Sequence, residues 1–334
     1  MKNVLIIYTG GTIGMVRTEK GYAPDNALYS ALSHIDDLRA PGMPQWTLLE
    51  LSPLLDSSNM TVNEWNEIAE LIGTYYTQYD GFVILHGTDT MAYTASALSF
   101  MLEGLDKPVI LTGAQIPMCE MRSDGRDNVV AAVLIAGEGK VHEVALYFGG
   151  TLLRGNRATK YSADGLQAFM SPNYPALAET GITIRYHEQV LLSRDTRTFC
   201  VRKLKEVPIG VIKVFPGIQF QLFEQIMTEQ LRGVVIEAFG TGNIPNGDCA
   251  LLPIVQRASR NGTLLVVCSQ CACGSVSLGA YETSAGLKSA GAVSAFDMTT
   301  EAAVAKLYYL FSCGYPAEQI KQLMAENLCG ELTR

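Results

Sequence analysis

The chain has 334 residues, of which 48% are hydrophobic and 17% charged, a composition typical of a globular protein and unlike that of a disordered one. Its length is sufficient for two domains of ordinary size. The formal net charge of -8 argues against a protein that binds nucleic acid, because phosphate binding needs basic patches.

The amino terminus carries no recognisable export signal, since Lys2 is followed by an apolar run too short for the core of a signal peptide. No apolar stretch approaches the length that spans a membrane. Eight cysteines without such a signal favour reduced thiols over a disulfide framework. We therefore expect a cytoplasmic protein without membrane contacts.

Apolar runs that end in glycine or polar residues indicate buried parallel strands, because strands covered on both faces lose the alternation of half-exposed ones. Such runs alternate with helical patterns through the first half of the chain. Strands are predicted at 4–7, 47–51, 81–85, 109–111 and 144–148, helices at 61–74, 92–102 and 129–136, and loops at 15–26 and 151–160. This order predicts a doubly wound α/β domain.

The second half repeats the alternation on a smaller scale, after an aperiodic and charged segment. Strands are predicted at 209–214, 233–236 and 264–268, and helices at 219–228, 251–261, 299–312 and 316–327. We therefore predict two doubly wound α/β domains with mainly parallel sheets. The larger N-terminal domain covers 1–187, a linker covers 188–206, and the smaller C-terminal domain covers 207–334.

The first predicted strand runs directly into the turn Thr9-Gly10-Gly11-Thr12. Ligands of open α/β sheets bind at the carboxyl ends of the strands, so both threonines stand where functional hydroxyls are expected. An ordinary strand-to-loop turn with capping threonines would contain the same residues. The glycine spacing does not match either of the common phosphate-binding motifs.

A second strand ends in a similar turn, His86-Gly87-Thr88-Asp89-Thr90. The sequence Thr-Gly-Gly-Thr-Ile-Gly followed by His-Gly-Thr-Asp-Thr resembles the two signatures of the bacterial-type L-asparaginase and glutaminase family. The resemblance extends over nearly the whole chain and is strongest toward the cytosolic type I branch. It includes Leu111-Thr112-Gly113-Ala114-Gln115, Arg154-Gly155-Asn156-Arg157 and Phe239-Gly240-Thr241-Gly242-Asn243.

The resemblance implies hydrolysis of L-asparagine to L-aspartate and ammonia. Thr12 would attack the side-chain amide and form an acyl-enzyme, while Thr88, Asp89 and Lys160 would form a triad that transfers the proton. Tyr22, in the loop at 15–26, would orient the Thr12 hydroxyl. Without the resemblance, Lys160 would be read as a solvated lysine and Tyr22 as a tyrosine that packs its loop onto the surface.

Substrate recognition is implied for a second set of residues. Asp56, Ser57 and Ser58 would receive the α-amino and α-carboxylate groups of the substrate, Asp89 would also hold the α-ammonium group, and Ala114 would lie near the leaving amide. Asp56, Ser57 and Ser58 could instead begin the helix predicted at 61–74, because aspartate and serine are favoured helix caps. No cofactor is expected.

Metal chemistry is not expected either. The cysteines at 268, 271 and 273 are close in sequence, but no second pair or histidine lies near them, and Cys268 ends a predicted buried strand. The four histidines show no metal-binding spacing.

The resemblance also implies a homo-oligomer, either a dimer or a tetramer, whose active sites lie near an intimate dimer interface. Tyr281 and Glu282 are the candidate residues that a partner subunit would contribute. Some cytosolic relatives bind a second asparagine as an effector, and an arginine stands in certain of them where this chain has Glu237. A carboxylate cannot pair with the effector's carboxylate, so we expect no activation by that route.

Three alternatives share this sequence pattern: a glutaminase-asparaginase, the amidase subunit of a tRNA-dependent amidotransferase, and a non-catalytic amino-acid sensor. The amidotransferase subunit would carry an N-terminal extension, whereas the first strand here begins at Val4. A sensor would keep Asp56 and Asp89 but could lose Thr12 or Lys160. All four residues are present, which favours catalysis.

Overall fold

The computed structural model describes residues 2–19, 21–24, 28–223, 230–245 and 251–333. The chain forms two compact units that divide between Lys203 and Leu204. Each unit has its own parallel sheet and its own hydrophobic core. The segment predicted as a linker, 188–206, therefore lies mostly in the first unit. None of the described helices is long and apolar enough to cross a membrane.

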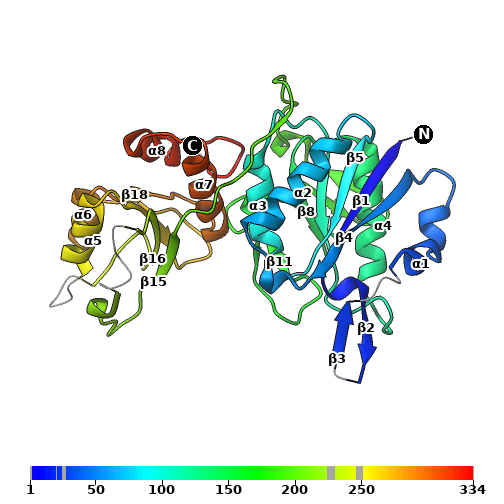
Figure 1. Ribbon diagram of the computed structural model, residues 1–334, viewed down its shortest axis with the longest axis horizontal. Coiled ribbons are helices and arrows are strands. Elements are labelled where there is room, and N and C mark those ends of the chain that lie inside the picture. The colour runs from blue at the N-terminus through cyan, green and yellow to red at the C-terminus, as the bar shows by residue number, and fades with distance from the viewer. Residues whose placement is uncertain (1, 20, 25–27, 224–229, 246–250, 334) are drawn as a thin grey trace. The chain divides into compact units, whose positions relative to one another are not determined.

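The first unit is built around an eight-stranded sheet with helices on both faces (Figure 1). The strands of this sheet are β1 (Asn3–Gly10), β4 (Gln45–Leu55), β5 (Gly81–Leu85), β7 (Val109–Thr112), β8 (Val144–Phe148), β9 (Thr151–Arg154), β12 (Ala178–Thr180) and β13 (Ile184–Tyr186). Its helices are α1 (Leu28–Ser33), α2 (Val62–Tyr75), α3 (Met91–Met101) and α4 (Gly125–Glu138). Smaller pairs are β2 (Met15–Thr18) with β3 (Gly21–Pro24), β10 (Thr159–Lys160) with β11 (Phe169–Met170), and β6 (Leu102–Glu103) with β14 (Cys200–Val201).

The strand order in the large sheet is β13-β12-β9-β8-β7-β5-β1-β4. Neighbours from β4 to β8 are parallel, and β9, β12 and β13 form an antiparallel edge. From β1 the chain goes first to β4 on one side and then to β5 on the other side. Such a switch point opens a crevice at the carboxyl ends of β1 and β5, and ligands of doubly wound sheets bind there.

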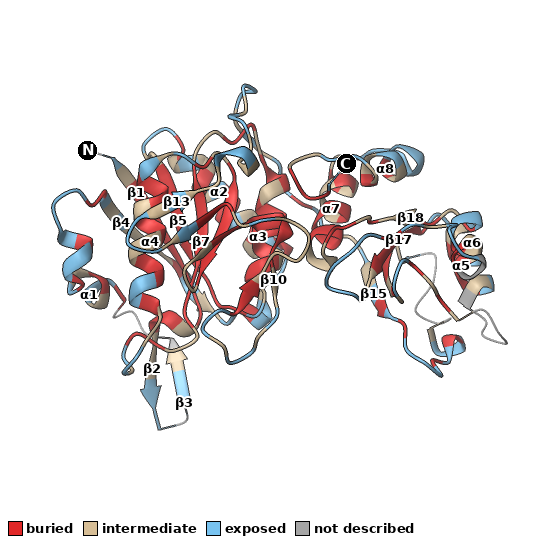
Figure 2. Ribbon diagram, turned by 180° about the vertical axis from the view of Figure 1, so that it is seen from behind, coloured by how far each residue is buried: buried red, intermediate tan, exposed pale blue. Residues whose placement is uncertain are grey.

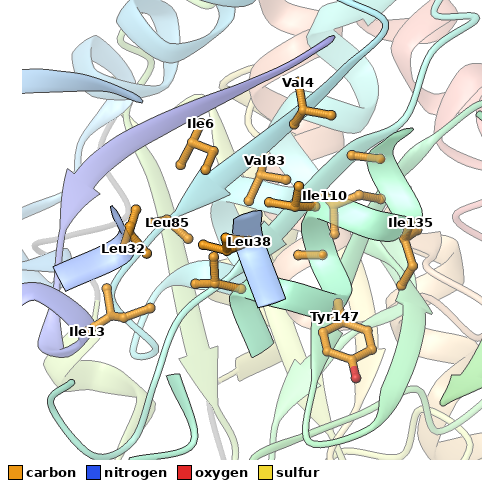
Figure 3. Close-up of a cluster of buried hydrophobic side chains, with 14 of the residues drawn as sticks. Val4, Ile6, Ile13, Leu32, Leu38, Val83, Leu85, Ile110, Ile135 and Tyr147 are labelled. Atoms are coloured by element: carbon orange, nitrogen blue, oxygen red, sulfur yellow. The ribbon is translucent and has the colours of Figure 1, made fainter. Parts of the chain in front are cut away.

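The sheet is buried on both faces. Helix α4 covers one face, while α2 and α3 cover the other (Figure 1), and the central strands are buried along their length (Figure 2). On the α4 side, alternate residues of β1 and β5 pack against helix residues such as Leu32 and Ile135 (Figure 3). Because both faces are covered, the central strands are apolar throughout, as the sequence predicted.

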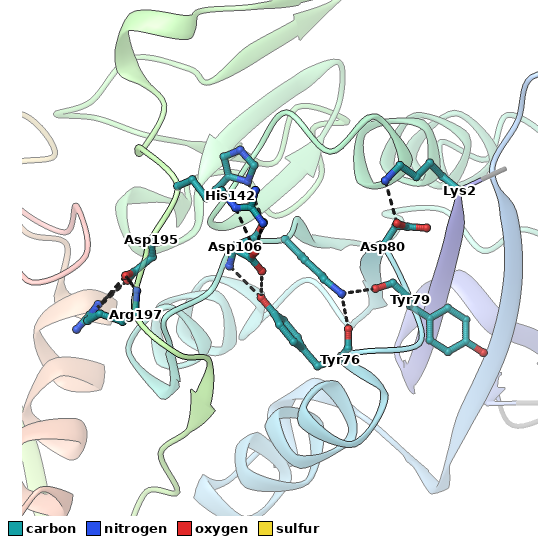
Figure 4. A network of polar contacts seen from close by, with 10 residues as sticks. Lys2, Tyr76, Tyr79, Asp80, Asp106, His142, Asp195 and Arg197 are labelled. Carbon is teal, nitrogen blue, oxygen red and sulfur yellow. Dashed lines mark hydrogen bonds and ion pairs between the residues drawn. The ribbon is translucent and has the colours of Figure 1, made fainter.

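The amino-terminal edge of this sheet is held together by polar contacts (Figure 4). The Tyr76 hydroxyl donates to the Asp106 carboxylate, and burial raises the pKa of Tyr76. The Lys107 ammonium donates to the carbonyl oxygens of Tyr76 at 2.5 Å and Tyr79 at 2.8 Å, and a His142 ring nitrogen lies 2.9 Å from the carbonyl oxygen of Asp106. These hydrogen bonds connect neighbouring loops. They therefore stabilise the edge of the sheet that lies opposite to the carboxyl ends of the strands.

The second unit contains a four-stranded parallel sheet in the order β15-β16-β17-β18. Its elements are β15 (Ile209–Lys213), β16 (Gly233–Ala238), α5 (Leu251–Arg260), β17 (Leu264–Ser269), α6 (Glu282–Ser289), β18 (Val293–Ser294), α7 (Thr300–Ser312) and α8 (Ala317–Met324). The strands follow one another in chain order across the sheet. The described part of this unit therefore has no switch point like the one at β1.

Most predicted elements are present, and two-domain α/β architecture with mainly parallel sheets is confirmed. The prediction of a loop at 151–160 is wrong for its first four residues. Thr151–Arg154 form β9, which pairs antiparallel with β8. The loop predicted at 15–26 contains the hairpin of β2 and β3. Of the helix predicted at 219–228, only a short 3-10 turn, Phe220–Phe223, is seen, and 224–229 lie outside the described residues.

Candidate active site

Three turns meet at the carboxyl ends of β1, β4 and β5. A Cβ atom on Gly11 would lie 2.4 Å from the backbone nitrogen and the Cα of Gly87, and one on Gly87 would lie 2.5 Å from Ser57 Oγ. Gly11 also has a φ of 87°, which strains any residue with a side chain. Glycine at these positions therefore lets the turns that carry Thr12, Thr88 and Ser57 touch one another.

Lys160 reaches the same place from a distant part of the sequence. Its Nζ donates to Thr88 Oγ1 at 2.8 Å and to Asp89 Oδ1 at 2.7 Å. The Lys160 side chain is 18% exposed and that of Asp89 is 65% exposed, so the ion pair faces solvent on its carboxylate side. These contacts bring together the three residues of the predicted catalytic triad.

The buried turn before Lys160 explains how the lysine is held. The Arg154 guanidinium donates to the Glu143 carboxylate, with Nε 2.5 Å from Oε2, and to the carbonyl oxygen of Val190 at 2.7 Å. Gly155 packs against β8, since a Cβ there would lie 2.9 Å from the carbonyl oxygen of Val144. The arginine is almost fully buried, so this turn is fixed to the sheet, and Lys160 follows it in β10.

Thr12 lies just beyond β1, in the one-turn 3-10 helix Thr12–Gly14. It is partly exposed, and within the described ranges its hydroxyl has no hydrogen-bond partner. Thr9, three residues earlier, is buried and donates to the carbonyl oxygen of Leu85 at 3.1 Å. Of the two threonines in this turn, Thr12 is thus the one whose hydroxyl is available to a ligand.

Comparison with known proteins gives a consistent result. The family model "Asparaginase, N-terminal" matches residues 3–192, and the model "Glutaminase/Asparaginase C-terminal domain" matches residues 208–324. The chain belongs to the asparaginase family. This assignment confirms the resemblance drawn from the two threonine turns.

Individual relatives align with this chain over nearly its full length. L-asparaginase 1 of Escherichia coli (strain K12) is 45% identical, covering 99% of this chain and 98% of that protein. The crystal structure of L-asparaginase I from Vibrio cholerae has a TM-score of 0.92 and 43% identity, covering 100% of this chain and 99% of that one. A longer mouse protein named 60 kDa lysophospholipase is 41% identical, covering 99% of this chain and 63% of that protein.

The turn predicted to recognise the substrate is tied to the turn that carries Thr88 and Asp89 in this asparaginase-family chain. Asp56 Oδ1 accepts from the backbone N–H of Ser58 at 2.9 Å and from its hydroxyl at 3.0 Å, while the Thr90 hydroxyl donates to the carbonyl oxygen of Ser57 at 2.7 Å. Helix α2 is capped instead by Thr61 and Glu64, which form a capping box. The alternative that the Asp56 turn begins this helix is therefore wrong, although Asp56 does cap the one-turn 3-10 helix Ser57–Asn59 that precedes it.

Tyr22 lies on the hairpin formed by β2 and β3, and it is 49% exposed. Its hydroxyl donates to Glu120 Oε1 at 2.8 Å, and this hydrogen bond raises the pKa of Tyr22. The structure thus places the Tyr22 hydroxyl beside Glu120, and the predicted orientation of Thr12 by Tyr22 stays a prediction.

The remaining predicted site residues are Ala114 in the first unit and Tyr281 and Glu282 in the second. Ala114 is buried, and its Cβ would lie 3.2 Å from a Cβ on Gly125. Tyr281 is exposed at the N-terminus of α6 in the second unit, and Glu282 is the first residue of that helix. Their contribution to a partner's site stays a prediction. Within the ranges given above, no cluster of three or more metal-binding side chains is present.

Gln115 is a site residue that the sequence reasoning did not single out. Its Oε1 accepts from the Thr88 hydroxyl at 3.2 Å, and its Nε2 donates to the carbonyl oxygen of Gly165 at 3.2 Å. The Asp124 carboxylate accepts from the backbone N–H of Gln115 at 3.0 Å. The available signal was its position three residues after the end of β7, the same offset that Thr88 has from the end of β5.

His86 holds the turn that carries Thr88 and Asp89. It is fully buried, and burial lowers its pKa to about 4. One ring nitrogen lies 2.7 Å from the carbonyl oxygen of Gly87 and the other lies 2.9 Å from the Thr94 hydroxyl, which also accepts from the indole of Trp65 at 3.0 Å. A neutral ring with these contacts holds the turn, and its nitrogens are already engaged.

Proposed function

We propose that this chain is an L-asparaginase that hydrolyses L-asparagine to L-aspartate and ammonia through a threonine acyl-enzyme. One observation carries the proposal: the Lys160 ammonium touches both Thr88 and Asp89, beside a turn that presents Thr12. A hydroxyl nucleophile, a lysine and a carboxylate at one crevice are the groups that an amide hydrolysis needs.

Substrate recognition follows from charge and position. The Asp89 carboxylate is largely exposed and close to Lys160, so it can accept the substrate's α-ammonium in a charge-assisted hydrogen bond. The hydroxyl and backbone N–H of Ser57 can donate to the α-carboxylate, whereas those of Ser58 already donate to Asp56 and would have to exchange that carboxylate for the substrate. Held at its head group, the substrate would extend its side-chain amide toward Thr12 and Ala114.

The chemical steps use two hydroxyls and one amine. Thr12 Oγ1 attacks the amide carbon, and the Lys160 ammonium gives a proton to the leaving nitrogen, which departs as ammonia. The Thr12 proton passes through Thr88 to Lys160 and restores the ammonium. Backbone N–H groups in the turns at Gly11 and Gly87 stabilise the oxyanion, an interaction worth roughly 10²–10³ in rate per donor. Water then attacks the acyl-enzyme by the same route, which releases L-aspartate and regenerates Thr12.

The alternative activities are open to the same site. A glutaminase-asparaginase would accept the longer amide of glutamine, and a sensor would bind amino acid without turnover.

We also propose a cytoplasmic homo-oligomer, a dimer or a tetramer, in which Tyr281 and Glu282 approach a partner's site. The domain limits 1–187 and 207–334, with a linker at 188–206, also stay a prediction.

Ammonia release from asparagine and from glutamine tests the proposal. The Thr12→Ala variant is expected to lose activity by roughly 10⁴-fold or more, as nucleophile removal does in hydrolases. Thr9→Val is the matched control, since it removes a buried hydroxyl from the same turn while keeping its shape. Full activity in Thr12→Ala would reject this nucleophile, and calorimetric binding of asparagine without turnover in the wild type would favour the sensor.

The glutamine result and one further substrate distinguish the remaining activities. Glutamine hydrolysis at a rate similar to that of asparagine would assign a glutaminase-asparaginase. Lysophosphatidylcholine tests the activity named for the mouse relative, and we expect no fatty acid release from the wild type.

A further inference from the structure

The structure separates the three neighbouring cysteines of the second unit into two classes. Cys268 lies within β17, is 1% exposed, and burial raises the pKa of its thiol. Cys271 and Cys273 are exposed in the turn that follows this strand. A buried protonated thiol is a poor nucleophile and a poor ligand. Of the three cysteines, Cys268 is therefore unreactive, and Cys271 and Cys273 form a pair that solvent can reach.

The turn that carries the pair is fixed at its start. Ser269 Oγ donates to the carbonyl oxygen of Gly240 at 2.6 Å and accepts from the backbone N–H of Cys271 at 3.0 Å. The Gln270 side chain donates to the carbonyl oxygens of Val214 at 2.5 Å and Glu237 at 2.7 Å. These bonds anchor the turn to β15 and β16 of its own sheet.

The rest of the turn is exposed to solvent. Gly274 has a φ of 113°, and nothing lies within 4 Å of the position that a Cβ would occupy there. The chain bends through 270–274, and all residues from 271 to 275 are exposed. The positive φ favours glycine at this position, and the thiols of Cys271 and Cys273 are both accessible to solvent.

The spacing of the pair suits a disulfide. Two residues separated by one other are at most about 7 Å apart between Cα atoms, and a bend shortens this distance. Disulfides take Cα separations of about 4.4–6.8 Å. A metal centre fits less well, since in the parts of the chain that the structure describes no third metal-binding side chain joins the two thiols.

We propose that Cys271 and Cys273 are a redox-active thiol pair that a small disulfide, such as oxidised glutathione, closes into an intramolecular disulfide. One thiolate attacks a sulfur of oxidised glutathione, forms a mixed disulfide and releases one glutathione. The second thiolate then attacks the protein sulfur of that mixed disulfide and releases the other glutathione. Two protein thiols are oxidised and one glutathione disulfide is reduced to two thiols, so atoms and electrons balance.

Mass spectrometry of the folded full-length protein tests the proposal. Trypsin cleaves after Arg260 and Lys288 and releases residues 261–288, which contain all three cysteines. After incubation with oxidised glutathione and alkylation, this peptide should be two hydrogen atoms lighter and should carry one alkyl group, on Cys268. A peptide that stays fully reduced while exposed Cys119 and Cys200 are glutathionylated would overturn the proposal.

Single variants identify the partners. Cys271→Ser and Cys273→Ser should each stop at a mixed disulfide, one glutathionyl group heavier, whereas Cys268→Ser should still close. The pairing would be overturned if the Cys268→Ser variant failed to form the intramolecular disulfide. Mixed disulfides that persist in the wild type would also overturn it. Phenylarsine oxide gives an independent readout with the wild type alone, because it should remain bound in excess monothiol and be lost in both Cys271→Ser and Cys273→Ser. Retention by either variant would contradict the pair.

Discussion

Two lysine–carboxylate pairs in this protein have the same chemistry and very different surroundings. In the first unit, Lys160 and Asp89 meet at the crevice, and the carboxylate is 65% exposed. In the second unit, Lys306 and Glu331 are both 0% exposed, with Nζ 2.6 Å from Oε1. The difference shows that solvent access decides what such a pair can do. An accessible lysine can exchange protons and meet a ligand, whereas a sealed one can only hold the chain together.

The contacts around each pair agree with this distinction. Lys160 also donates to the Thr88 hydroxyl, a group that can react. Lys306 donates instead to the carbonyl oxygens of Met324 and Glu326, while Glu331 accepts from the backbone N–H of Leu328. Burial lowers the pKa of Lys306. The sealed pair therefore fixes the C-terminal segment against α7.

Replacing the accessible lysine should have the largest effect on activity. Lys160→Met is expected to lower kcat for asparagine hydrolysis by roughly 10²–10⁴-fold, the range for a lost acid–base group. Its free energy of unfolding should change by only about 0–1 kcal/mol, because exposed ion pairs contribute little. Steady-state kinetics and urea unfolding measure the two quantities. A stable variant with wild-type kcat would remove Lys160 from the mechanism.

Replacing the sealed lysine should reverse this pattern. Lys306→Met leaves the Glu331 carboxylate buried without its partner, which should destabilise the protein by about 3–5 kcal/mol. The kcat per folded molecule should stay close to that of the wild type. Urea unfolding compares this variant with the double variant Lys306→Met/Glu331→Leu, which should recover much of the loss. Equal stabilities of the single and double variants would contradict the interpretation.

The sequence predicted the parts of this comparison that depend on local pattern. Thr12 and Thr88 stand at the ends of apolar runs, so their place at one edge of the sheet follows from parallel topology. The pairing of Lys160 with them came from the family resemblance, since a lysine in a polar loop carries no such signal. Lys306 was not singled out, because its partner lies in a C-terminal segment without regular structure.

The sequence contains a hairpin signal immediately before strand β9. Gly149 and Gly150 separate two apolar runs and have φ values of 57° and 90°. Two glycines between such runs are a known sign of a tight hairpin. The sequence alone could therefore have predicted β9. The contacts of Gln115 and His86 could not be predicted in this way, because they depend on side chains that meet only after the sheet has formed.

The buried His86 should make stability depend on pH, unlike an exposed histidine. Its pKa is about 4 in the folded protein and about 6.5 when unfolded, so between these values the unfolded chain binds more protons. Stability should therefore fall as pH drops from 6.5 to 4, by about 3 kcal/mol, with no further loss from this group below pH 4.

Urea unfolding at a series of pH values measures this contribution. His86→Gln should remove that part of the slope, whatever its effect on stability at pH 7. His34→Gln is the matched control, because His34 is exposed, and it should keep the slope of the wild type. Identical slopes in the wild type and in His86→Gln would mean that another group is responsible.

Gln115 should show the smallest effect, since it acts on Thr88 through one hydrogen bond. Removing the acceptor in Gln115→Met should lower kcat roughly 3–10-fold, the equivalent of about 0.5–1.5 kcal/mol, with little change in KM. Gln115→Glu keeps an oxygen for the Thr88 hydroxyl but loses the donor to Gly165, as Gln115→Met also does. If orientation of Thr88 is what matters, Gln115→Glu should retain more kcat than Gln115→Met. Equal losses would instead assign Gln115 to the support of the loop at Gly165.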